Sequence, residues 1–173
     1  MEIRALRPDD DRTCFDSGDP DLDRFFARFA GQNQFVNHLG TTYVAVEKGL
    51  ILGYVTVAPG QIEAVEIPPA SIRRKLPRYP LPILRLARMA VARSFQKKGL
   101  GRELLRFAFE LALRMAEAYG CMGVCVDAKP AALDFYTRFD FEPLVAVAGL
   151  PPTHPQPTPL FLHIATLKDA LRP

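Results

Sequence analysis

The chain has 173 residues, 49% hydrophobic and 24% charged, a composition that excludes a disordered protein. This length suits one globular domain of about 100–200 residues, so we expect residues 1–173 to form a single domain. No apolar run reaches the roughly 18 residues of a membrane-spanning helix, and the N-terminus lacks a secretory signal, so we expect a cytoplasmic protein without membrane contact.

Charge is distributed unevenly along the chain, although the net charge is only +3. Residues 67–106 carry eleven Lys and Arg residues and one acid, Glu103. Such a segment attracts polyanions, for example a nucleotide cofactor or a nucleic acid, and the alternative is a solvated basic face balanced by the acidic N-terminal region. The three cysteines and three histidines lack disulfide or zinc-ligand spacing, so we expect no metal.

The pattern of apolar residues predicts alternating strands and helices. In chain order these are a strand at residues 3–6, a helix at 20–31, strands at 41–47 and 51–58, an exposed Pro- and Arg-rich loop at 70–82, a strand at 83–91, a helix at 102–119, a strand at 124–126, a short helix from 130, a strand at 144–148, a Pro-rich loop at 151–159 and a strand at 160–165. Asp19 caps the first helix, Lys48-Gly49 forms a hairpin turn, and Gly120 ends the long helix. This order predicts an α/β fold.

The most informative local feature is the glycine-containing turn Gln96–Gly101, which separates an apolar strand from the long helix. A helix N-terminus offers unpaired backbone N–H groups, and glycine lets phosphate oxygens approach them, so this turn predicts an anion cradle. Lys97, Lys98 and Arg102 add mobile cations around it. The turn has neither the GxGxxG spacing of a dinucleotide site nor the GxxxxGK[ST] spacing of a P-loop.

Three other segments accompany this turn, namely Leu86-Ala87-Arg88-Met89-Ala90-Val91, Val126-Asp127-Ala128 and Phe135-Tyr136. In this order and spacing they resemble the GNAT superfamily of acyl-CoA-dependent N-acetyltransferases, over roughly residues 41–145. The resemblance implies a mixed, mostly antiparallel sheet that is splayed at the acyl-CoA site and flanked by helices. It also implies acetyl-CoA as the co-substrate, with its pyrophosphate bound by Gln96, Lys97, Lys98, Gly99, Leu100, Gly101 and Arg102.

A second set of motifs extends over nearly the whole chain. It comprises Phe15-Asp16-Ser17-Gly18, Leu22-Asp23, Gly40-Thr41-Thr42, Gly53-Tyr54, Arg73-Arg74-Lys75-Leu76-Pro77 and Tyr79-Pro80. These motifs are similar to those of the GNAT toxins of bacterial toxin–antitoxin pairs. That resemblance implies acetylation of the α-amino group of aminoacyl-tRNA, a cognate antitoxin and a homodimer. The sequence departs from the superfamily at Asp140, where a glycine is usual behind Tyr136, although Asp tolerates left-handed backbone angles.

Acetyl transfer from a thioester to an amine needs a neutral amine, donors for the developing oxyanion and a proton for the thiolate. We expect backbone N–H groups near Met89, Ala90 and Val91 to meet the oxyanion, and Tyr136 to supply the proton. An α-amine with a pKa of about 7.7–8.0 is already partly neutral at pH 7, so it needs little help from a base. The carboxylates that remain open as bases acting through a water are Glu47, Glu63, Glu66 and Asp127.

The basic side chains also suggest an RNA contact. The candidates are Arg73, Arg74, Lys75, Arg78, Arg85 and Arg88, and Tyr79 could stack on a base. We expect Arg88 to be partly buried and nearer the active site than the others. Two alternatives stay open: an acetyltransferase that acts on a small amine or a protein N-terminus, and a CoA- or RNA-binding module without turnover.

Overall fold

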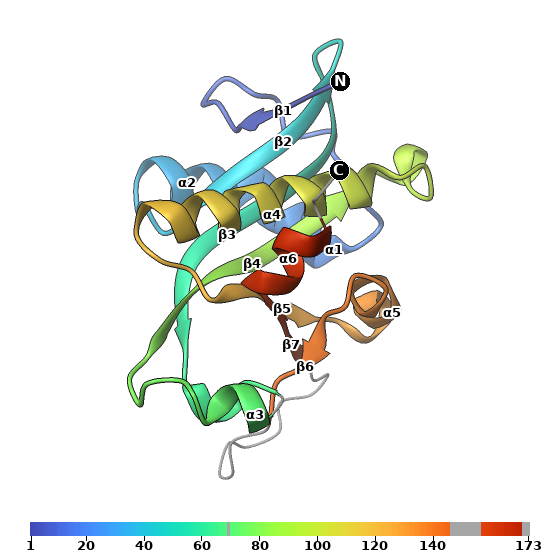
Figure 1. The fold of residues 1–173 in the computed structure, drawn as a ribbon. Coiled ribbons are helices and arrows are strands. Elements are labelled where there is room, and N and C mark those ends of the chain that lie inside the picture. The colour runs from blue at the N-terminus through green and yellow to red at the C-terminus, as the bar shows by residue number, and fades with distance from the viewer. Residues whose placement is uncertain (69, 146–156, 171–173) are drawn as a thin grey trace. The chain divides into compact units, whose positions relative to one another are not determined.

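The computed structural model describes residues 1–68, 70–145 and 157–170 (Figure 1). Contacts between Cα atoms divide the chain into two units, residues 1–58 with 86–110 and residues 59–85 with 111–173. Each unit has its own cluster of buried apolar side chains. No helix of the described residues combines the length and apolar character needed to cross a membrane. A single domain over the whole chain stays a prediction.

Seven strands form one sheet in the order β1-β2-β3-β4-β5-β7-β6. Their bounds are β1 Glu2–Ala5, β2 Thr41–Glu47, β3 Leu50–Ile62, β4 Leu81–Val91, β5 Gly123–Ala128, β6 Glu142–Pro143 and β7 Thr158–His163. The pairs β1/β2, β2/β3, β5/β7 and β6/β7 are antiparallel. Helices accompany these strands, which confirms the expected α/β fold with a mostly antiparallel sheet (Figure 1). The splay of the sheet stays a prediction.

The first helical segment runs further than the sequence predicts. It consists of α1 Pro20–Arg24, a π-helical turn Phe25–Phe29 and α2 Ala30–Phe35. The Asp19 side chain accepts hydrogen bonds from the Asp21 and Leu22 N–H groups, which confirms the cap. Gly31 lies within α2 and does not end it. A Cβ atom at Gly31 would lie 2.5 Å from Nη1 of Arg12, so a larger residue would displace the end of that flexible side chain.

The hairpin and the end of the long helix follow the sequence prediction. Lys48 and Gly49 have φ angles of 49° and 79°, as a tight turn between right-twisted strands requires. Helix α4, Leu100–Ala118, ends before Gly120, whose φ angle is +107°. The Gly120 N–H donates to the Met115 carbonyl at 3.0 Å and so satisfies a terminal carbonyl of α4.

The unit of residues 59–85 and 111–173 packs around the cluster of Ile62, Ile67, Leu81, Ile83, Cys125 and Phe161. Its helices are α3 Ala70–Arg73, α5 Leu133–Thr137 and α6 Ile164–Ala170. Helix α3 is a single short turn at the start of the segment that the sequence predicts to be a loop. A 3-10 turn at Pro130–Ala132 leads into α5, as the proline predicts. Strand β4 begins at Leu81, two residues before its predicted start.

The predictions for the C-terminal region are partly wrong. Strand β6 ends at Pro143, so Leu144 and Val145 are not in the expected strand, and residues 146–148 lie outside the described residues. Of the predicted loop, residues 151–156 also lie outside them, whereas Thr158 and Pro159 begin β7. Proline is compatible with the first positions of a strand, where its missing N–H can be spared.

The last predicted strand is also too long. Strand β7 ends at His163 and α6 begins at Ile164, because the Nδ1 atom of His163 accepts the Ala165 N–H at 3.0 Å and favours a helix start. The sequence analysis missed α6.

Candidate active site

The turn between β4 and α4 is open and contains two left-handed residues. A 3-10 turn at Arg93–Phe95 follows β4, and Lys97 and Gly99 then have φ angles of 60° and 89°. The left-handed conformation of a non-glycine residue costs about 1–2 kcal/mol, so the surrounding contacts must hold Lys97 in place. A Cβ atom at Gly99 would meet nothing within 4 Å, which leaves room for a ligand.

The start of α4 supplies the donors expected for an anion. The Arg102 N–H donates to the Gly99 carbonyl at 3.0 Å, and the N–H groups before it precede the intrahelical ladder. These N–H groups lie at the positive end of a 19-residue helix. The left-handed turn, the open space at Gly99 and the helix N-terminus fit the diphosphate of an acyl-CoA, and we call residues 96–102 the cradle.

A pocket of about 280 Å³ adjoins the cradle at the first turn of α4. It is lined by Met1, Glu47, Leu52, Phe95, Lys98, Gly99, Leu100, Arg102 and Glu103. Its lining contains as many Lys and Arg as Glu side chains, so these charges largely offset one another. The attraction for a diphosphate is therefore expected from the backbone N–H groups, with Lys97 and Arg102 as exposed cations beside them.

The three cationic side chains of the cradle differ in their contacts with the protein. Lys97 and Arg102 are exposed, as expected of side chains that can reach a ligand. The Nζ atom of Lys98 instead donates to the Ser94 carbonyl at 2.7 Å and lies 5.3 Å from the Phe95 ring centroid. Lys98 is exposed as well, but its own turn supplies an acceptor and an aromatic face, and its contact with a diphosphate stays a prediction.

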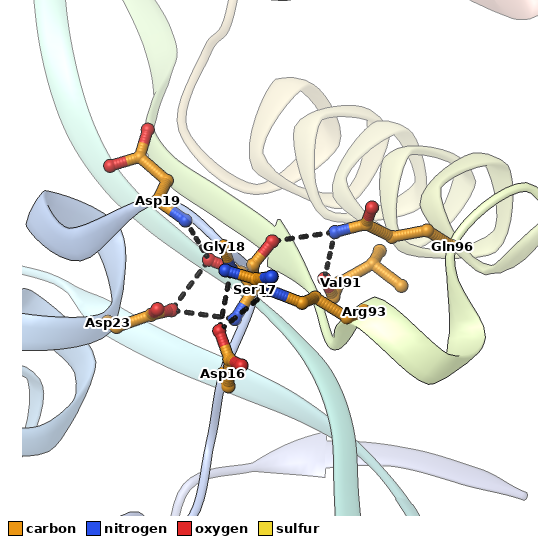
Figure 2. A network of polar contacts seen from close by, with 8 residues as sticks. All are labelled: Asp16, Ser17, Gly18, Asp19, Asp23, Val91, Arg93 and Gln96. Atoms are coloured by element: carbon orange, nitrogen blue, oxygen red, sulfur yellow. Dashed lines mark hydrogen bonds and ion pairs between the residues drawn. The ribbon is translucent and has the colours of Figure 1, made fainter.

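The Gln96 side chain spans two backbone carbonyls (Figure 2). Its Nε2 atom donates to the Ser17 carbonyl at 2.7 Å and to the Val91 carbonyl at 2.9 Å. A carboxamide has two N–H hydrogens, and both are used here. Contact between Gln96 and a diphosphate stays a prediction, but the amide visibly ties the cradle to the loop before α1.

Further contacts in Figure 2 join the same two segments. The Arg93 N–H donates to the Asp16 carbonyl at 2.9 Å, and Arg93 Nε pairs with Asp16 Oδ1 at 3.1 Å. Within the first of these segments along the chain, Asp23 Oδ1 accepts the Ser17 N–H at 2.9 Å and the Ser17 hydroxyl at 2.6 Å. The sequence analysis assigned no role to Asp16, Ser17 or Asp23, although their motif carries the toxin resemblance.

The strand residues expected at the oxyanion lie at the end of β4. Ala90 is buried, whereas Met89 and Val91 are half-buried. A Cβ atom at Gly53 would lie 3.0 Å from the Ala90 carbonyl, so the glycine lets β3 pack closely here. The oxyanion role of Met89, Ala90 and Val91 stays a prediction.

Tyr136 belongs to the other unit, on α5, and is only 5% exposed. Its ring packs against Phe135 and Phe141, with centroids 5.2 and 5.4 Å away. Burial raises the pKa of the Tyr136 phenol, which is therefore protonated throughout the physiological pH range. Asp140 has a φ angle of 63°, so it adopts the left-handed turn that the superfamily assigns to glycine.

The predicted RNA-binding residues fall in both units. Arg74, Lys75, Arg78 and Tyr79 are exposed, whereas Arg73 is half-buried and donates to the Val65 carbonyl at 3.2 Å.

Arg88 lies in the unit that contains the cradle, 5.3 Å from the Phe25 ring centroid. It is exposed, so the expectation that Arg88 is partly buried is wrong. Its guanidinium lies over the ring face and also donates to the Ala87 carbonyl at 2.7 Å.

The four carboxylates considered as bases already have partners. Glu47 lies 3.5 Å from the N-terminal ammonium, and Asp127 pairs with Arg85 at 3.1 Å. Glu63 and Glu66 form a reciprocal capping box. Each carboxylate has a structural role, which weakens its case as a base. Among the described residues, no group of three or more His, Cys, Asp or Glu side chains could hold a metal ion.

Comparison with known proteins agrees with this geometry. Residues 38–143 match the acetyltransferase (GNAT) domain family. A tRNA-acetylating toxin of Mycobacterium tuberculosis is 34% identical over 169 residues, which cover 96% of this chain and 92% of the toxin. The structure of AtaT complexed with acetyl-methionyl-tRNAfMet superposes with a TM-score of 0.85 at 25% identity, over 99% of both chains. AtaTR bound with acetyl-CoA matches with a TM-score of 0.79 at 26% identity, over 99% of this chain and 98% of that one. The chain therefore belongs to the GNAT acetyltransferase family.

Proposed function

We propose that this protein transfers the acetyl group of acetyl-CoA to the α-amino group of an aminoacyl-tRNA and thereby blocks translation as a toxin. One observation carries the proposal: the open, left-handed turn at the N-terminus of α4, in a chain 34% identical to a tRNA-acetylating toxin. The turn accounts for the acyl donor, and the similarity over 96% of the chain accounts for the acceptor.

The cradle binds the diphosphate, and the bound co-substrate supplies an activated acetyl thioester. The backbone N–H groups of residues 97–101 donate to phosphate oxygens, and Lys97 and Arg102 add positive charge. At the end of β4, the backbone near Met89, Ala90 and Val91 donates to the oxygen that gains charge as the amine attacks.

Tyr136 supplies the proton that the departing sulfur needs. Burial raises the pKa of the Tyr136 phenol above the value of about 8.5 of a free thiol, so the phenol is the weaker acid. It stays protonated and donates a hydrogen bond to the sulfur as negative charge develops there, whereas complete transfer of its proton is uphill. Its hydrogen bond to sulfur therefore forms mainly in the transition state, where it lowers the barrier.

An α-amine acceptor reduces the need for a dedicated base. An α-amine with a pKa of about 7.7–8.0 is neutral in roughly a tenth of molecules or more at pH 7. A lysine side chain, with a pKa of about 10.4, would need a base. The structural partners of Glu47, Glu63, Glu66 and Asp127 agree with an α-amine acceptor.

Recognition of tRNA uses basic side chains, most of which are exposed. The proposed contacts are Arg73, Arg74, Lys75, Arg78 and Arg88, which neutralise backbone phosphates. As the family resemblance implies, we expect the protein to act in the cytoplasm as a homodimer and to be neutralised by a cognate antitoxin. AtaT forms a complex with the C-terminus of the antitoxin AtaR, which supports an antitoxin for this chain as well.

Incubation with acetyl-CoA and a pool of charged tRNAs, followed by mass analysis of the aminoacyl-adenosines, tests the function directly. We expect N-acetylated aminoacyl-adenosine from a restricted set of tRNAs. Acetylation of free amines or protein N-termini alone would favour the small-amine or protein acceptor. Binding of coenzyme A or RNA without any product would favour a binding module.

A further inference from the structure

A polar network joins the loop before α1 to the turn before α4 (Figure 2). The bonded residues are 77 and 79 positions apart in the sequence. Asp16 holds Arg93 through a backbone hydrogen bond of 2.9 Å and an ion pair of 3.1 Å, and Ser17 accepts the Gln96 amide at 2.7 Å. Both ion-pair side chains are more than 60% exposed, so water screens the pair and the Ser17–Gln96 bond is the more directional link.

Asp23 anchors this network from within α1. Its Oδ1 atom accepts both the N–H and the hydroxyl of Ser17, at 2.9 and 2.6 Å. Hydrogen bonds to an ionised carboxylate are about twice as strong as those between neutral groups. Helix α1 is itself fixed to the core, because the buried Tyr54 donates its hydroxyl hydrogen to the Leu22 carbonyl at 2.9 Å. One route from the core to the cradle thus passes through Asp23, Ser17 and Gln96, beside the direct bond from the Ala92 N–H to the Leu52 carbonyl at 2.8 Å.

We propose that Asp23 and Ser17 are positioning residues for the diphosphate cradle, although neither lies in it. They fix the Ser17 carbonyl, this carbonyl orients the Gln96 amide, and the amide holds the cradle against the end of β4 through Val91. The proposal rests on the proposed function, because the cradle is the site of the acyl donor.

The geometry at Gln96 gives the reason for such an anchor. Lys97 immediately after it is left-handed, a conformation that a free chain avoids, and both amide hydrogens of Gln96 are spent on carbonyls. Gln96 therefore acts on the turn in preference to the ligand. Without the Asp23–Ser17 hydrogen bonds, the turn samples other conformations. Part of the binding free energy of coenzyme A is then used to restore the binding conformation of the turn, so the affinity falls.

The anchor and the ligand are linked reciprocally. If Asp23 improves the affinity for coenzyme A, bound coenzyme A must stabilise the Asp23–Ser17 contacts by the same factor. Hydrogen exchange of the Ser17 and Gly18 amides should slow when coenzyme A binds, although these amides lie outside the cradle.

Calorimetric titration with coenzyme A, together with steady-state kinetics in acetyl-CoA, tests the proposal on three variants. Asp23→Ala removes both bonds to Ser17 and should weaken coenzyme A binding about five- to tenfold, with a matching rise in KM and little change in kcat at saturation. Asp23→Asn keeps an oxygen acceptor and should recover most of the affinity. Asp21→Ala removes the same charge from the same helical turn, where Asp21 pairs with Arg24 at 2.9 Å, and should bind like the unaltered protein.

The outcomes separate the possibilities. A merely structural Asp23 would lower the active fraction, so kcat would fall while KM and the dissociation constant stayed unchanged, and the proposal would be overturned. The same holds if Asp23→Ala and Asp21→Ala bind coenzyme A equally well. An unaltered protein that binds no coenzyme A would overturn the proposed function as well. If Asp23→Ala does not fold, Ser17→Ala, which removes the 2.6 Å bond, should weaken binding about two- to threefold, and unchanged affinity would count against the anchor.

Discussion

The turn before α4 and the helix that carries Tyr136 are held in opposite ways. The turn is exposed, and hydrogen bonds to carbonyls and carboxylates keep it in a strained conformation. Tyr136 is buried among phenylalanines, and burial alone raises the pKa of its phenol. Polar contacts at the surface can be remade when a ligand binds, whereas burial sets a protonation state beforehand. In the proposed reaction, the first suits the binding of a large co-substrate, and the second keeps the phenol protonated as a hydrogen-bond donor.

The largest effect should come from Tyr136→Phe, which removes the phenolic proton and keeps the buried ring. We expect kcat to fall by about 10²–10⁴-fold, the usual contribution of a general acid, while the affinity for coenzyme A is retained. Steady-state kinetics and calorimetry on the same preparation measure the two quantities. Tyr119→Phe, at a side chain that is 76% exposed, is the control. Full turnover by Tyr136→Phe would remove Tyr136 from the mechanism.

Gly99→Ala tests the turn itself. The left-handed φ angle of 89° is strained for alanine by about 1–2 kcal/mol, and the new methyl group enters the space proposed for phosphate. We expect coenzyme A binding to weaken about tenfold or more, since each 1.4 kcal/mol is a factor of ten. Gly49→Ala is a matched control, because Gly49 has a φ angle of 79° and equally open surroundings in the β2–β3 hairpin. Equal affinity of the two variants would show that the cradle lies elsewhere.

Neutralising Arg74, Lys75 and Arg78 together tests the proposed RNA contact. Each lost phosphate contact should reduce the slope of log affinity against log salt concentration by about 0.7–0.9, so the triple variant should lose about two units of slope. Filter binding of tRNA across a salt series gives this number. A triple variant at the exposed Arg106, Arg114 and Arg138 is the comparison. An unchanged slope in the first variant would exclude the loop from the interface.

The smallest effect is expected in the pH dependence of the reaction rate. It tests the contrast between the buried Tyr136 and the exposed turn before α4. The rate should rise with pH as the α-amine, with a pKa of about 7.7–8.0, loses its proton. Burial raises the pKa of Tyr136, and a raised pKa keeps the acid protonated to higher pH, so no decline from its ionisation should appear below about pH 10. Kinetics from pH 6 to 10 with stability checked at each pH measure this. A decline near pH 8 that Tyr136→Phe abolishes would contradict the burial argument.

Local rules accounted for many elements of the fold. Asp19 as a cap, the Lys48-Gly49 turn and the stop at Gly120 each depend on neighbours within a few residues, and all three are confirmed. The turn before α4 was also predicted, because a glycine-containing turn before a long amphipathic helix is a local pattern. Its use as a diphosphate cradle stays a prediction. The same local reasoning missed α6, whose start depends on the His163 side chain.

The sequence by itself therefore determined most elements before the C-terminal region, the family resemblance and the position of the glycine-containing turn before α4. Only the tertiary structure decided how the cradle is held: the two hydrogens of the Gln96 amide, the ion pair of Arg93 and the anchor at Asp23. The burial of Tyr136, which raises the pKa of its phenol, likewise could not be predicted from the sequence around it. The reason is physical, because hydrogen bonds and burial depend on distances between segments far apart in the chain, and these distances exist only after folding.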